Sequence, residues 1–208
     1  MSVPDKSIDP RLLASAEAEF QKQGFLKAEL KTICENAGIT TGAVYKRYKG
    51  KEDLFCAVVY DIADRLDLFV KERSNIDFSS LSDEEIYQSW QMTYDAMLPL
   101  FSLLYEHRQT FALLIGKAAG TRYEYFNHEF VTKMSYAYEQ FYAEAKKRGL
   151  AQAEVTREEF HVLLSSFWTC ICEPFVHEMS WEQIKEHCRI VCRFFNWSAV
   201  IMLKKGNS

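Results

Sequence analysis

Apolar side chains recur at helical spacing along most of this chain, and turn residues divide the pattern into separate helices. The first apolar run follows Asp9 and Pro10, which supply an N-cap and a pre-set first helical turn, and it ends near Gly24. Its apolar residues fall on one helical face: Leu12, Leu13, Ala16 and Phe20. The pattern therefore predicts a first helix over about residues 9–24.

Two short helices are predicted next. The first carries the apolar stripe Leu30, Ile33 and Cys34. It stops at Gly38, because glycine readily adopts the left-handed conformation that ends a helix. The second covers residues 41–48, with Thr40 as its N-cap and with Val44 and Tyr48 on its inward face.

A long fourth helix is predicted over residues 51–73, because its apolar residues keep a helical period throughout: Leu54, Phe55, Val58, Val59, Ile62, Leu66, Phe69 and Val70. The segment 74–80 that follows is polar and aperiodic. We expect the joint between two domains there, with the domains at residues 8–68 and 82–204.

Several later helices are marked by a Ser or Thr followed three residues on by Glu or Gln, a pattern typical of a capping box. The pairs are Ser82 with Glu85, Thr121 with Glu124, Thr156 with Glu159, and Ser180 with Gln183. Pro99 should break or kink the helical run that precedes it, and Gly149 should end another helix. Since no segment alternates as a strand does, we predict an all-α protein.

The region of the first four helices has the features of a DNA reader. Two short helices joined through Gly38 match a helix-turn-helix, whose second helix enters the major groove. On that second helix Thr41, Gly42, Tyr45 and Lys46 lie opposite the inward residues. Residues 1–52 carry a net charge of +2, whereas the remainder carries −6, so the cations are concentrated where a phosphate backbone would lie. Lys51 begins the long helix and is a candidate phosphate clamp.

The stretch from Ile33 to Phe55, ICENAGITTGAVYKRYKGKEDLF, resembles the signature of TetR-family transcriptional regulators, and the likeness extends over about residues 8–68. The resemblance implies that residues 41–48 form the recognition helix of an N-terminal three-helix helix-turn-helix domain. It implies these DNA contacts: Tyr45 and Lys51 on phosphates, Thr40, Thr41, Gly42 and Lys46 on bases or backbone, and Lys31 and Arg47 nearby.

Two departures from the family pattern bear on affinity. Ala28 and Glu29 stand where the family usually has a Ser/Thr pair at the start of the second helix, and Tyr48 replaces a usual Phe. The first change removes a phosphate hydrogen bond and places a carboxylate near the DNA backbone. We therefore expect weaker sequence-independent affinity than in a typical member.

The resemblance also implies a C-terminal effector-binding and dimerisation domain joined through the long fourth helix. Family members pair their last two long helices across a two-fold axis, and the wide apolar stripes here fit either that or a hairpin within one chain. The candidate interface residues are Phe160, Leu164, Phe167, Ile171, Ile184, Val191 and Phe195. The resemblance further implies a homodimer on a pseudo-palindromic double-stranded DNA operator, and repression that a small effector relieves.

Aromatic and methionine residues in the middle of the chain suggest where a flat or hydrophobic effector could bind. We name Trp90, Tyr94, Met97 and Tyr123 as candidate pocket residues; the alternative is that these side chains are ordinary core.

Other classes of function find little support in the sequence. No signal segment or membrane span is present, and six cysteines without a CxxC pattern favour reduced thiols in the cytoplasm. No metal spacing or catalytic motif occurs, so we expect no enzyme activity and no cofactor. Two alternatives remain: a regulator controlled by a protein partner or acting as an activator, and a helical interaction module or small-molecule carrier with a vestigial DNA-binding unit.

Overall fold

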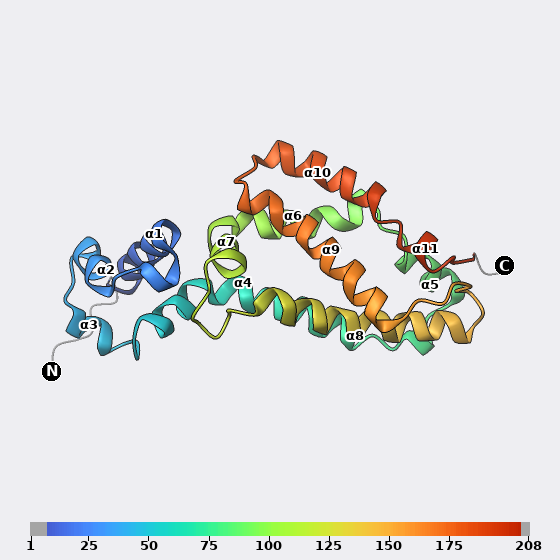
Figure 1. Cartoon of the computed structure of the whole chain (residues 1–208), viewed down its shortest axis with the longest axis horizontal. Coiled ribbons are helices and arrows are strands. Elements are labelled where there is room, and N and C mark those ends of the chain that lie inside the picture. Colours follow the sequence, from blue (N-terminus) through green and yellow to red (C-terminus); the bar gives the residue numbers. More distant parts are fainter. Residues whose placement is uncertain (1–7, 205–208) are drawn as a thin grey trace. The chain divides into compact units, whose positions relative to one another are not determined.

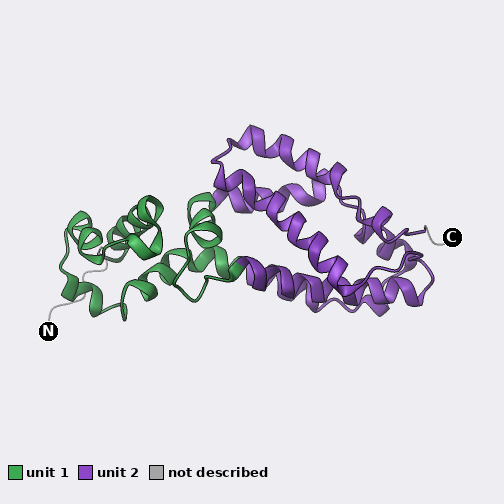
Figure 2. Cartoon of the chain, viewed as in Figure 1, with its two compact units in different colours: residues 1–65, 107–126 green, residues 66–106, 127–208 purple. Residues whose placement is uncertain are grey.

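The computed structural model describes residues 8–204, and that part of the chain is helical, with a single isolated bridge between Ala151 and Leu203 and no strand (Figure 1). The all-α prediction is confirmed. The described residues pack as two compact units: residues 8–65 with 107–126, and residues 66–106 with 127–204 (Figure 2). No described helix is long and apolar enough to cross a membrane.

The first unit, which we call unit 1, contains α1 (Ile8–Lys27), α2 (Leu30–Ala37), α3 (Thr41–Tyr45), the first part of α4 (Lys51–Ser74) and α7 (Arg108–Gly116). Three phenylalanines form the centre of its core, with the rings of Phe20 and Phe25 lying 5.0 and 5.5 Å from that of Phe55. Both contacts are edge-to-face, the arrangement that aromatic pairs prefer. This core fixes α1 against the start of α4.

The helix α7 packs with α1 although the sequence separates them widely. The Gln21 side-chain amide donates to the Gln109 carbonyl at 2.6 Å, and the Phe25 amide donates to the Lys117 carbonyl at 3.2 Å. The packing units therefore interleave along the chain, whereas the domains expected from the sequence, residues 8–68 and 82–204, are consecutive. Those ranges remain a proposal for how the chain divides by function.

The second unit, unit 2, contains the end of α4, a short 3-10 helix η1 (Phe78–Ser80), α5 (Asp83–Ser89), α6 (Tyr94–Glu106), α8 (Phe126–Lys147), α9 (Arg157–Val176), α10 (Trp181–Phe194) and α11 (Trp197–Val200). Helix α10 packs along α6 and also contacts α9 (Figure 1). Apolar residues from these helices fill the unit, among them Ile86, Phe101, Phe160 and Ile184.

One arginine fixes the segment between α4 and α5. Arg148 follows α8, and its guanidinium donates to the carbonyl oxygens of Ser79 at 3.0 Å and Leu81 at 2.6 Å. The same group pairs with Asp83 at 3.1 Å and with Glu144 at 2.8 Å. A loop that the sequence marks only as polar is thereby held in one position against α8.

Most helix boundaries expected from capping residues are confirmed. The capping boxes that begin at Ser82, Thr156 and Ser180 are formed, and α5, α9 and α10 start directly after them. The fourth expected box, at Thr121 and Glu124, is wrong. The Thr121 hydroxyl donates to the Ala118 carbonyl at 2.7 Å within a turn, and the next helix begins only at Phe126.

The expected break at Pro99 is also wrong, since this proline lies inside α6 and the chain leaves helical geometry earlier, at residues 91–93. Pro99 is the sixth residue of the helix. Its nitrogen carries no hydrogen and lies beyond the four amides that lack intrahelical partners, so the proline removes one intrahelical hydrogen bond without ending the helix.

Candidate functional site

The turn between α2 and α3 is built by local interactions. Gly38 has φ 66° and ψ 38°, a left-handed conformation that is unfavourable for most other residues. The Ile39 amide donates to the Cys34 carbonyl at 3.0 Å. Thr40 then caps α3, its hydroxyl accepting from the Ala43 amide at 3.3 Å. These contacts set the angle at which α3 leaves α2.

Helix α3 turns one face inward and the other to solvent. Val44 is fully buried, whereas the Tyr45 side chain is 62% exposed. Thr40, Thr41, Gly42 and Lys46 are exposed as well, so five of the residues expected to contact DNA lie on the outer side of this short element. Unit 1 thus presents a continuous polar face with an aromatic ring and a cation.

The expected contact residue Lys31 on α2 and the N-cap residue Glu29 are exposed and make at most weak side-chain interactions. Lys31 lies 3.8 Å from Glu35, an exposed pair of little energetic weight. Glu29 is the N-cap of α2, yet its side chain makes no capping hydrogen bond. Lys31 is therefore available to a phosphate, and the Glu29 carboxylate stands at a helix start where the family usually has hydroxyls.

Arg47 has a different role from the one expected. Its guanidinium pairs with Asp9 at 2.6 Å and donates to the Ala43 carbonyl at 3.2 Å, and its side chain is only 21% exposed. The arginine thus connects the end of α3 to the start of α1. We withdraw Arg47 as a DNA contact, because contacting DNA would require both interactions to break.

Lys51 likewise turns its side chain into unit 1. Its ammonium donates to the carbonyls of Leu26 at 3.2 Å and Ala28 at 2.9 Å, and it lies 4.5 Å from the centre of the Phe25 ring. The expectation that this ammonium clamps a phosphate needs correction. The side chain stabilises the connection between α1 and α2, and only the amides at the start of α4 stay in a position to meet a phosphate.

Replacing Lys51 with methionine is therefore expected to lower the stability of the protein by about 1–2 kcal/mol, since two charge-assisted hydrogen bonds are lost. Thermal unfolding followed by circular dichroism measures the change. Lys49→Met is the control, because Lys49 is an exposed cation two residues away. Equal melting temperatures for the two variants would contradict the structural role.

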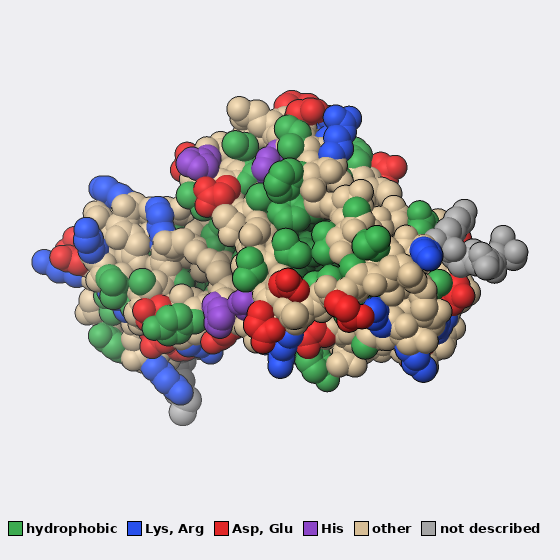
Figure 3. Space-filling model, turned by 45° about the vertical axis from the view of Figure 1, so that its right-hand side comes forward, with side chains coloured by type: hydrophobic (Ala, Val, Ile, Leu, Met, Phe, Trp, Pro, Cys, Tyr) green, Lys and Arg blue, Asp and Glu red, His purple; other side chains and the backbone are tan. Residues whose placement is uncertain are grey.

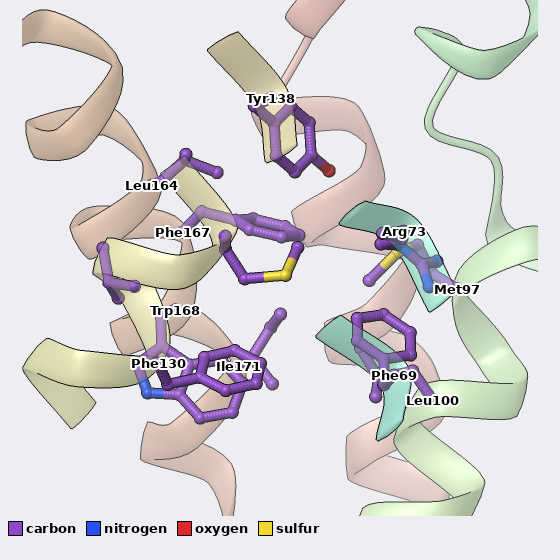
Figure 4. Close-up of a pocket in the computed structure, with 12 residues that line it drawn as sticks. Phe69, Arg73, Met97, Leu100, Phe130, Tyr138, Leu164, Phe167, Trp168 and Ile171 are labelled. Atoms are coloured by element: carbon purple, nitrogen blue, oxygen red, sulfur yellow. The ribbon is translucent and has the colours of Figure 1, made fainter. Parts of the chain in front are cut away.

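Unit 2 contains two neighbouring cavities. The larger cavity has a volume of about 560 Å³ and an aromatic wall formed by Phe78, Trp90, Tyr138, Phe141 and Trp197. The smaller cavity, of about 60 Å³, lies among α4, α6, α8 and α9 (Figure 4). Arg73, Met97 and Tyr138 border both. A volume of several hundred Å³ with an apolar wall is typical of a small-molecule site.

The four candidate pocket residues do not come together. Trp90 and Met97 line the larger cavity, whereas Tyr94 lines a separate hollow beside Arg189. Tyr123 lies in unit 1 and is wrong as a pocket residue. Sequence reasoning missed Arg73 and Tyr138, and the available signal was weak because Arg73 matches the cations commonly found in a last helical turn.

Burial shifts the pKa values of Arg73 and Tyr138, the two polar side chains that border both cavities. It lowers the pKa of Arg73, whose guanidinium lies 3.5 Å from the centre of the Phe69 ring. It raises the pKa of the Tyr138 hydroxyl, an effect that the neighbouring Arg73 partly offsets. At neutral pH the arginine is charged and the tyrosine is protonated.

The residues expected at the dimer interface lie mostly inside unit 2. Six are buried in the chain itself: Phe160, Leu164, Ile171, Ile184, Val191 and Phe195; Phe167 is half-buried. The assignment of these residues to a partner surface is therefore corrected: they are the core of their own unit. Their helices also carry exposed apolar residues, namely Val162 and Val176 on α9 and Ile190 and Phe194 on α10. Figure 3 shows hydrophobic side chains gathered on one face of unit 2.

A helix-turn-helix with an exposed second helix, together with a helical unit that encloses a cavity, defines the class of one-component DNA-binding regulators. The family model described as "Bacterial regulatory proteins, tetR family" matches residues 12–58. The match covers α2, α3, most of α1 and the start of α4, so the N-terminal part of the chain is similar to the DNA-binding region of TetR-family transcriptional regulators.

Solved structures share the fold at low sequence identity. SmeT, the repressor of the Stenotrophomonas maltophilia multidrug efflux pump SmeDEF, is 18% identical over 95% of this chain and 91% of its own, with a TM-score of 0.64. NalD, the secondary repressor of the Pseudomonas aeruginosa pump MexAB-OprM, is 18% identical over 90% and 93%, with a TM-score of 0.57. FadR of Bacillus subtilis, solved with stearoyl-CoA, is 13% identical over 89% and 96%, with a TM-score of 0.54.

Proposed function

We propose that this regulator is a homodimeric repressor that binds a pseudo-palindromic operator through α3 and leaves it when a small hydrophobic effector fills the larger cavity. The observation that carries the proposal is the pairing of an exposed recognition face with a cavity of about 560 Å³ in the same chain. The need to reach bacterial DNA implies that it works in the cytoplasm.

The proposed DNA contacts are the exposed residues Lys31, Thr40, Thr41, Gly42, Tyr45 and Lys46, with the backbone at Lys51 adding a phosphate site. The structure of SmeT with triclosan and that of FadR with stearoyl-CoA are examples of this fold with a ligand. They support an apolar effector for this chain.

Helix α4 offers a physical route from effector to DNA. It runs without interruption from Lys51, which holds the connection between α1 and α2, to the turn that contains Arg73, a wall residue of both cavities. An effector that prefers one position of Arg73 therefore biases the whole helix. The change in operator affinity equals the difference in effector affinity between the two states of the protein.

Gly42→Ala tests the DNA-binding face without disturbing the fold. An added Cβ would meet only the Thr40 hydroxyl, at 3.9 Å, and the backbone of Gly42 is not in the left-handed region. Alanine in a helix is more stable than glycine by about 0.5–1 kcal/mol, so the variant should melt no earlier than the wild type. If the DNA backbone approaches Gly42, operator affinity should fall about tenfold or more, since even a small steric clash costs over 1 kcal/mol.

The measurement is a fluorescence-anisotropy titration against the intergenic DNA upstream of the gene, at two salt concentrations. Gly116→Ala is the matched control, because Gly116 is also helical and exposed, and a Cβ added there would meet no atom within 4 Å. Unchanged operator affinity of Gly42→Ala would remove this face from the interface. Failure of the wild type to prefer its upstream DNA over random DNA would favour the interaction-module alternative.

A further inference from the structure

The larger cavity is rich in hydrogen-bond donors that lack acceptors. Among the described residues, the indole nitrogens of Trp90 and Trp197 and the side-chain amide nitrogen of Gln91 are buried without a hydrogen-bond partner, and all three residues line this cavity. Buried donors normally have partners, and each one left unpaired costs about 1–3 kcal/mol. Three residues with unpaired buried donors thus surround one cavity, and their polar groups lie in its wall close behind the aromatic rings.

The charge of this wall points in the same direction. Arg73 forms no ion pair within 4 Å in the described part of the chain, and Glu72, which also lines the larger cavity, is exposed to solvent. The guanidinium packs on the Phe69 ring, an arrangement that leaves its remaining N–H groups available. Figure 4 shows the Tyr138 hydroxyl turned toward the side of the smaller cavity where Arg73 lies. A cation and a neutral hydroxyl thus both border the two cavities, and each is close enough to affect the pKa of the other.

Stacked aromatic rings form a flat apolar layer in the wall, beside the polar residues Glu72, Ser89 and Gln91. The Trp90 and Phe141 rings stack with their centres 5.1 Å apart and an interplanar angle of 19°, and Phe78 stacks on Phe141 at 4.6 Å. Parallel rings of this kind leave a surface that suits a planar or alkyl body. No part of this layer would favour a sugar or a free phosphate.

We propose that the effector of this regulator is an amphiphilic organic anion, a carboxylate on an apolar body, whose acid group lies between Arg73 and Tyr138 and whose body lies against Trp90 and Phe141. This inference rests on the proposed function, in which the larger cavity is the effector site. It adds that Arg73 recognises the charge of the effector. Because Arg73 belongs to α4, the residue that pairs with the acid also lies on the helix that leads to the DNA-binding unit.

A matched pair of fluorescent probes tests this assignment. 1-Anilinonaphthalene-8-sulfonate and N-phenyl-1-naphthylamine have the same apolar body and differ in the anionic group. Each probe is titrated into the wild type, Arg73→Gln, Arg73→Lys and the control Arg157→Gln. Arg157 is an exposed residue on α9 that pairs with Glu139 of α8. We expect the wild type to bind the anionic probe about tenfold more tightly than the neutral one, the difference typical of a charge-assisted hydrogen bond.

Arg73→Gln should abolish this preference while leaving the affinity for the neutral probe within about twofold, and Arg73→Lys should keep most of it, since the charge remains. Arg157→Gln should behave as the wild type. Equal affinity of the wild type for both probes, a preference that survives in Arg73→Gln, a preference lost equally in Arg157→Gln, or binding of neither probe would each overturn the proposal.

A second titration separates this inference from the proposed function. Operator binding of the same variants is measured with each of the two probes present at saturation. Release of the wild type by both probes, without a preference for the anion, would leave the repressor function standing and overturn only the anion assignment. Tight binding of the anionic probe without any release would uphold the anion site and overturn the ligand-released repressor.

Discussion

Phe194→Glu is expected to convert the protein from a dimer to a monomer and to lower its operator affinity by about a thousandfold. Phe194 is 77% exposed on α10, and Ile190, one helical turn earlier, is 54% exposed. On the neighbouring α9, Val162 and Val176 are also exposed. Large apolar residues exposed on successive turns of one helix, as Ile190 and Phe194 are, are a common sign of a protein interface.

The proposed occupant of this face is a second copy of the chain. Two recognition helices held about 34–36 Å apart can meet successive turns of the major groove, so a dimer gains affinity from its second half-site. Linking two binding units raises affinity by about 10²–10⁴. A glutamate at position 194 would bury a charge in the proposed interface without a partner, which opposes association.

The oligomeric state is measured by sedimentation equilibrium, and operator affinity by anisotropy on the same samples. Tyr136→Glu is the matched control, because Tyr136 is 54% exposed on α8 and lies outside the proposed face. A Phe194→Glu protein that remains dimeric would place the interface elsewhere. A wild type that is monomeric at concentrations where it binds its operator would contradict the two-fold arrangement itself.

The features that the sequence predicts well are those that depend on near neighbours. Gly38 ends α2 and Thr40 caps α3 because each needs contacts only a few residues away. The capping pair Ser180 and Gln183 succeeds for the same reason. The capping box predicted at Thr121 does not form, because the Thr121 hydroxyl donates to the nearby Ala118 carbonyl in a turn.

The features that the sequence misses depend on which side of a helix meets which neighbour. The stripes that contain Phe160 and Ile184 were wide enough for a dimer interface, but these side chains are 1% and 0% exposed within one chain. A pattern of apolar positions shows that a face is buried, but not whether the partner is the same chain or another. The candidate interface residues are therefore the exposed apolar side chains on the same two helices, Val162, Val176, Ile190 and Phe194.

The sequence also fails to predict which partners the charged side chains of unit 1 have. Arg47 and Lys51 are cations in the right segment, yet Asp9 and the carbonyl of Ala28 take up their charged groups. Each partner is more than twenty residues away in the sequence, so no local rule could identify it. The DNA face that the structure leaves is smaller than the expected one and is centred on α3.

That smaller face leads to the second expected result. Changing Tyr45 to alanine together with Lys46 to glutamine should lower operator affinity by about a hundredfold, because each side chain that reaches DNA contributes about 1–3 kcal/mol. The fold should be unaffected, since Tyr45 is 62% exposed and Lys46 is exposed at the end of α3.

The single variants separate what each residue contributes. Tyr45→Phe keeps the ring and removes the hydroxyl, so a phosphate hydrogen bond would appear as an equal loss on operator and random DNA. Lys46→Gln should reduce the slope of affinity against salt concentration by about one if the lysine contacts a phosphate. If Lys46 instead contacts a base, the slope should change little and discrimination at one operator position should relax.

Anisotropy titrations at four salt concentrations distinguish these outcomes, with Lys22→Gln as the control because Lys22 is an exposed cation on α1, outside α2 and α3. An unchanged affinity of the double variant would mean that α3 is not the recognition helix, even though the fold is that of the family. A loss shared equally by Lys22→Gln would show that the net charge of unit 1, and not the face of α3, determines the binding.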